Sequence, residues 1–61
     1  MAWVVKKGSH TLHAGITASD AIDSFISLTK NEDKRLVSEA VAKFANGNSK
    51  IRVNGYTLRW Q

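Results

Sequence analysis

The chain has 61 residues, no cysteine, and a formal net charge of +4 from nine lysines and arginines and five acidic residues. This length allows a single domain, residues 1–61, whose core is too small to dispense with a stabilising partner. The absence of cysteine excludes disulfide bonds and thiolate metal sites, and the positive charge favours anionic partners.

These properties lead to four expectations about the setting in which the protein works. A core this small predicts a homodimer or another stable complex. A membrane span of about 18 apolar residues is not present, so no membrane partner is expected. The N-terminus lacks the order of a signal peptide, and cysteine is absent, so a cytoplasmic location is expected. No cofactor is expected, because the glycines are too far apart to form a phosphate-binding loop.

The first predicted element is a β-hairpin over residues 3–14. Its turn is Gly8–Ser9, a two-residue loop with glycine in the first position. Strict alternation then places Leu12 on an apolar face with Val5, and His13 on the opposite face. The predicted pairs are Lys6 with Thr11, Val5 with Leu12, Val4 with His13, and Trp3 with Ala14.

A first helix is predicted over residues 17–29. Thr17 is the candidate N-cap, and Asp20 follows three residues later, close to the pattern of a capping box. Apolar residues recur at helical spacing along this segment and form one stripe.

A second helix is predicted from about Asn31 to Asn46. Its N-cap is either Asn31 itself or Thr29 acting with Glu32. Gly47 ends the helix, because glycine tolerates the left-handed conformation that follows a helix terminus.

The clearest local pattern lies at the end of the chain. Ile51–Val53 and Tyr56–Trp60 alternate in polarity on either side of Asn54–Gly55, which is typical of a β-hairpin with a type I′ turn. The two-residue loop sets the register of the pairs. These pairs are Val53 with Tyr56, Arg52 with Thr57, Ile51 with Leu58, and Lys50 with Arg59.

These elements predict an α+β domain of order ββααββ. Its two helices pack on one face of a small antiparallel sheet made of the two hairpins. The apolar residues expected to face the helices are Trp3, Val5, Leu12, Val53, Tyr56, Leu58 and Trp60. The residues expected on the other face are Lys6, Thr11, His13, Lys50, Arg52, Thr57 and Arg59.

The charge is unevenly distributed. All five acidic residues lie within residues 17–46, whereas the strands carry five lysines and arginines and no acid. Lys50 directly opposite Arg59 is an unfavourable pair of like charges. Two interpretations stay open: the cations keep an exposed sheet soluble, or they meet an anionic partner.

The candidate nucleic-acid-binding residues follow from this pattern. The aromatic residues are expected on the helix side, so contact with the phosphates of a duplex fits better than stacking on bases. His13 would add a pH-sensitive contribution. The predicted site is Lys6, His13, Lys50, Arg52 and Arg59.

Catalysis and metal binding are not expected. His10 and His13 fall on opposite faces of a strand, with no cysteine or neighbouring carboxylate to complete a metal site. A small ribonuclease could use His13 as an acid or base, but no second catalytic group is evident. No catalytic residue is therefore predicted.

The leading hypothesis is a non-enzymatic, dimeric regulator that contacts nucleic acid through a basic sheet face. The alternative is a small inhibitor or adaptor, of the kind that phages and other mobile elements carry, that binds and blocks a larger protein. A pull-down with nuclease treatment separates the two, because a direct protein partner survives the nuclease.

Overall fold

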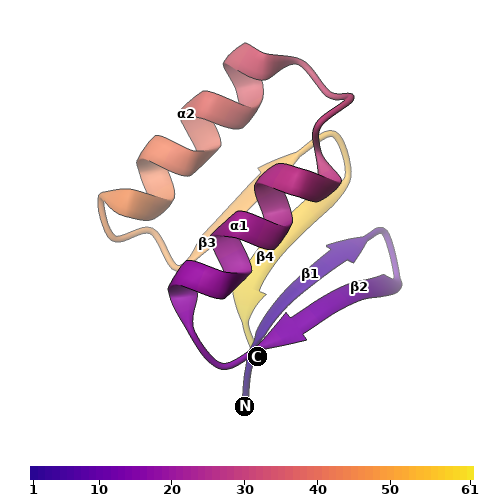
Figure 1. The fold of residues 1–61 in the computed structure, drawn as a ribbon, viewed down its shortest axis with the longest axis vertical. Coiled ribbons are helices and arrows are strands. Elements are labelled where there is room, and N and C mark those ends of the chain that lie inside the picture. Colours follow the sequence, from indigo (N-terminus) through magenta and orange to yellow (C-terminus); the bar gives the residue numbers. More distant parts are fainter.

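The computed structural model describes residues 1–61 and contains a single four-stranded antiparallel sheet with two helices (Figure 1). The strand order is β2-β1-β4-β3, so the two hairpins join through their first and last strands. The predicted ββααββ fold is confirmed. The elements are β1 (Trp3–Lys7), β2 (His10–Gly15), α1 (Ala18–Leu28), α2 (Lys34–Ala45), β3 (Lys50–Val53) and β4 (Tyr56–Trp60).

Both helices pack on the same face of the sheet. Helix α1 contacts β1, β2 and β4, whereas α2 contacts β3 at the edge of the sheet. Val5, Phe25 and Leu58 are fully buried between the two layers. Neither helix combines the length and hydrophobicity that crossing a membrane requires. The buried core is completed by Ala21, Ala40, Ile51 and Val53.

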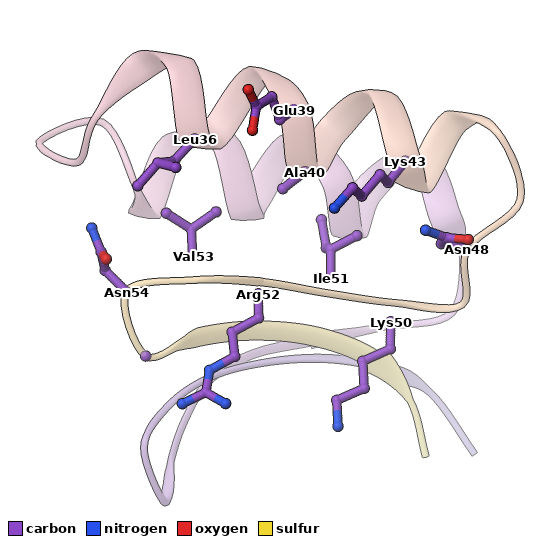
Figure 2. A pocket seen from close by; sticks show the side chains of 11 residues that line it. Leu36, Glu39, Ala40, Lys43, Asn48, Lys50, Ile51, Arg52, Val53 and Asn54 are labelled. Atoms are coloured by element: carbon purple, nitrogen blue, oxygen red, sulfur yellow. The ribbon is translucent and has the colours of Figure 1, made fainter.

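The C-terminal hairpin forms as predicted. All four predicted pairs between β3 and β4 are present. Asn54 and Gly55 both have positive φ, 46° and 88°, as a type I′ turn requires. Ile51 and Val53 therefore point towards α2, while Arg52 points to the opposite side (Figure 2).

The N-terminal hairpin matches the prediction at one pair and differs from it beyond that pair. Lys6 pairs with Thr11 as expected, but the register then shifts, and Val5 pairs with His13 instead of Leu12. Leu12 is the extra, unpaired residue of a β-bulge, and it is 43% exposed rather than packed under the helices. Because one extra residue exchanges the two faces of a strand, His13 lies on the helix side. The prediction that His13 lies on the outer face is wrong.

The first helix has its predicted cap. Thr17 is the N-cap, and its hydroxyl oxygen accepts a hydrogen bond from the backbone N–H of Asp20 at 3.1 Å. The N-terminal boundary of the second helix is corrected. Asp33 is the cap, accepting from the backbone N–H of Arg35 at 2.8 Å. Thr29 instead ends α1, where its buried hydroxyl donates to the carbonyl of Phe25.

The two hairpins meet along β1 and β4. Ala2 and Gln61 exchange two backbone hydrogen bonds of 2.8 Å at one end of this pairing, and the Gly8 N–H donates to the Gly55 carbonyl at the other. Between them, Lys6 lies opposite Thr57. This central pairing brings the cations of both hairpins onto one continuous sheet.

Candidate nucleic-acid interface

Four cations lie on the sheet face that the helices leave uncovered. Lys6 and Arg52 flank Thr57 from either side, and Lys50 lies directly opposite Arg59. The close-up in Figure 2 shows Lys50 and Arg52 pointing away from the helices. We call Lys6, Lys50, Arg52 and Arg59 the basic face.

Sheet geometry sets the size of this surface. Neighbouring strands are about 4.8 Å apart, so Lys6 and Arg52, which lie two strands apart, are separated by about 10 Å at the backbone. Lys50 and Arg52 are two residues apart on β3, a distance of about 7 Å. Lys50, Arg52 and Arg59 are exposed and Lys6 is half-buried. Four positive charges therefore share a surface about one nanometre across.

No acid of the chain neutralises the basic face. The one ion pair within 4 Å in the structure joins His13 to Asp20, and the side-chain hydrogen bonds include none of the four cations. This follows from the sequence, because every acid lies between the two hairpins, in residues 17–46. Three of these acids lie in the helices, which pack on the opposite side of the sheet, and Glu32 and Asp33 lie in the connection between the helices.

Lys7 is a strand cation that does not belong to the basic face. It lies on the helix side by alternation, opposite Tyr56. Its ammonium group donates to the carbonyl of Asn54 at 2.9 Å and lies 4.3 Å from the centre of the Tyr56 ring. These two contacts hold the ammonium group at the end of the sheet, away from the basic face.

The aromatic rings also lie away from the basic face. Trp3 packs edge-on against Phe44 of α2, with the ring centres 5.1 Å apart, and against Trp60 at 5.4 Å. This places the tryptophans on the helix side, where the sequence predicted them. The basic face therefore offers charge and no stacking surface.

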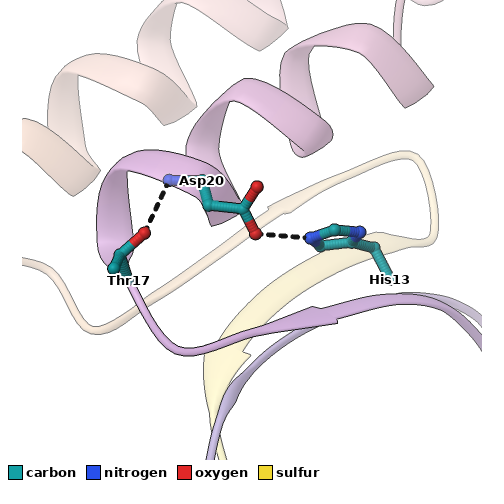
Figure 3. A network of polar contacts seen from close by, with 3 residues as sticks. All are labelled: His13, Thr17 and Asp20. Atoms are coloured by element: carbon teal, nitrogen blue, oxygen red, sulfur yellow. Dashed lines mark hydrogen bonds and ion pairs between the residues drawn. The ribbon is translucent and has the colours of Figure 1, made fainter.

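The structure gives His13 a different environment from the predicted one. Its Nε2 atom lies 2.7 Å from Oδ2 of Asp20, in the first turn of α1 (Figure 3). An alanine at Gly15 would place its Cβ against that same carboxylate, so the glycine makes room for the contact. The pair ties the end of β2 to the start of the helix, and His13 is not part of the basic face.

The contact between His13 and Asp20 was not predicted from the sequence. The available signal was an acid in the first turn of a helix that closely follows the strand. Using that signal required knowing that the bulge at Leu12 turns His13 to the helix side. Nowhere in the structure do three or more histidine, aspartate or glutamate side chains lie together as candidate metal ligands.

Comparison with protein family models, with curated proteins and with solved structures finds no match for this chain.

Proposed function

We propose that this chain is a small, non-enzymatic binding protein whose basic face contacts the phosphates of nucleic acid. The observation that carries the proposal is the clustering of Lys6, Lys50, Arg52 and Arg59 on one uncovered face without a neutralising acid. Phosphate contacts of this kind supply most of the non-specific affinity of proteins for nucleic acid.

The dimensions of the basic face support this proposal. Successive phosphates of one duplex strand are separated by about 3.4 Å along the axis. Successive phosphates are also rotated around the axis, so a surface about 10 Å across can reach at least two of them. The absence of aromatic rings from this face favours contact with a duplex backbone over stacking on unpaired bases.

The pairing of Lys50 with Arg59 gives a second reason. Like charges directly opposite each other on neighbouring strands destabilise a sheet by a few tenths of a kcal/mol or more. A bound phosphate would relieve this repulsion. A role in solubility alone would not require the two charges to be adjacent, because cations spaced further apart would serve it equally well.

A double charge reversal tests the proposal. The variant Arg52→Glu/Arg59→Glu places two carboxylates on the basic face. The control Lys34→Glu/Arg35→Glu makes the same change at exposed positions on α2. Each variant loses two units of charge at two positions, so both reach a net charge of 0 from +4. Binding to random-sequence duplex DNA and duplex RNA is measured by fluorescence anisotropy at low salt.

The sheet variant should lose at least tenfold in affinity, while the helix variant loses much less. Equal losses would show that net charge, and not the basic face, drives binding. If the unaltered protein binds neither duplex, the proposal is wrong, and the inhibitor or adaptor function becomes the leading hypothesis. Circular dichroism establishes that both variants remain folded.

Two further expectations belong to this proposal. We propose that the protein works as a homodimer in the cytoplasm. Support for dimerisation comes from the small core, because only nine of the 61 residues are buried. The apolar side chains that remain exposed offer surface for a partner: Met1, Leu12, Ile16, Ile26, Leu28, Leu36 and Trp60.

A further inference from the structure

The edge strand β3 has backbone groups available for another strand. Every second residue of β4 forms backbone hydrogen bonds with β1, and Gly55 and Gln61 are two of these residues. The residues between them, including Leu58, therefore form their backbone hydrogen bonds with β3. Leu58 pairs with Ile51, so the backbone groups of Lys50 and Arg52 point outwards from the sheet.

A groove runs along this open edge, between β3 and α2. Its volume is about 650 Å³, and α2 forms one wall while β3 and the following turn form the other. Figure 2 shows Leu36 above Val53, and Ala40 near Ile51, along the groove. Leu36 is 41% exposed. The groove therefore combines unpaired backbone groups with an apolar side chain that nothing in the chain covers.

The opposite edge of the sheet is different. In β2 the bulge at Leu12 interrupts the regular ladder, and bulges are one way in which proteins prevent an edge from pairing with another chain. Strand β3 pairs with β4 without a bulge. Of the two edges, β3 is the one prepared to accept a strand.

The alternation of β3 specifies the chemistry of a strand that pairs with it. Side chains on one face of such a strand would lie beside Ile51 and Val53, on the side of the groove that holds Leu36 and Ala40 of α2. Side chains on the other face would lie beside Lys50 and Arg52. The first set should be aliphatic and the second set acidic. Because β3 has four residues, about four residues of the added strand would pair with it.

We infer that the groove between α2 and β3 binds an extended segment of a partner protein in which aliphatic and acidic residues alternate. The segment adds to the sheet as a fifth strand beside β3. Backbone hydrogen bonds supply affinity in this mode of recognition, and alternate side chains supply specificity. The charges lining the groove agree, with Lys43, Lys50 and Arg52 against the single acid Glu39.

This inference does not depend on the proposed nucleic-acid binding. The two sites share Lys50 and Arg52, so an acidic segment bound at β3 would compete with phosphates for these two cations. Leu36 lines the groove and is not part of the basic face, whereas Lys6 and Arg59 are part of the basic face and do not line the groove. Substitutions at these positions separate the two activities.

The test uses a six-residue peptide of alternating valine and glutamate, blocked at both ends, with a valine–lysine peptide of the same length as its control. Binding is measured by calorimetry and by amide spectra of the full chain. The groove variant is Leu36→Gln, and its matched control is Leu28→Gln. Leu28 lies at the end of α1, outside the groove, and is 37% exposed.

The valine–glutamate peptide should bind, and the amide protons of Lys50 and Arg52 should become slower to exchange. Leu36→Gln should weaken that binding about tenfold, whereas Leu28→Gln should leave it unchanged. Neither substitution alters the charge of the basic face, so duplex binding should be retained in both.

Three results would overturn the inference: no binding of the valine–glutamate peptide, equal binding of the valine–lysine peptide, or equal affinities of the two variants. Protection of the Lys50 and Arg52 amides that rises with protein concentration in the absence of peptide would also overturn it, since a second copy would then occupy the edge. If the unaltered protein binds duplex but not the valine–glutamate peptide, the groove is refuted and the basic face is not.

Discussion

The two faces of the sheet are built from the same strands but have opposite properties. On the helix side, Val5 and Leu58 are fully buried, and Ile51 is nearly so. On the outer side, their neighbours Lys6, Arg59 and Arg52 carry charge and have no intramolecular ion pair. Successive residues of a strand point to opposite faces, so neighbours in sequence belong to different surfaces.

From this difference we expect that stability and the proposed binding can be changed separately. Substitutions on the helix side should change the free energy of unfolding. Substitutions of the cations on the outer side should change affinity for anions and leave the fold intact. The predictions below test each half of this statement.

The largest expected effect is on the helix side. Leu58→Ala should lower the free energy of unfolding by about 2–5 kcal/mol, because it removes buried methyl groups and leaves a cavity. Thr57→Ala, one residue earlier and on the outer face, should cost much less. Urea unfolding measures both. Similar losses in the two variants would contradict the assignment of the two faces.

A smaller effect, of opposite sign, is expected on the outer side. Lys50→Gln removes one of two like charges that lie directly opposite each other. The variant should be more stable at low salt by a few tenths of a kcal/mol, and the gain should vanish at high salt because of screening. A double-mutant cycle with Arg59→Gln isolates the pairwise contribution. A favourable coupling between the two cations would refute the repulsion.

Much of the fold could be predicted from local chemistry. Asn54–Gly55 favours one turn type, and a two-residue turn leaves the C-terminal hairpin one register. Thr17 could be recognised as a cap because its hydroxyl oxygen satisfies a backbone N–H of the first helical turn. In both cases the groups that interact are within a few residues of each other in the chain.

The N-terminal hairpin shows where local chemistry is insufficient. Gly8 has the positive φ of 59° that the predicted turn needs, and the predicted pair of Lys6 with Thr11 is correct. The bulge at Leu12 changes the register further along. It brings His13 to Asp20, a contact with a helix that the strand sequence does not encode. The error at His13 follows from this one inserted residue.

Two other features could not be predicted from local sequence. The cap of α2 depends on which of several suitable residues is free, and the joining of the hairpins depends on contacts between distant segments. Asn31, Thr29 and Asp33 are all residue types that cap helices, and the burial of Thr29 against the carbonyl of Phe25 removes one candidate. The pairing of β1 with β4 joins segments about fifty residues apart, and no local sequence pattern predicts it. The four cations were nevertheless predicted on one face, because each hairpin sets its own alternation.

The measurement that tests the basic face most directly is the salt dependence of duplex binding. Each phosphate contact contributes about −0.9 to the slope of log K against log salt concentration. Four contacts predict a slope of about −3 to −4, and Arg59→Gln should make it about one unit shallower. A slope near zero, or one that Arg59→Gln leaves unchanged, would contradict phosphate binding by this face.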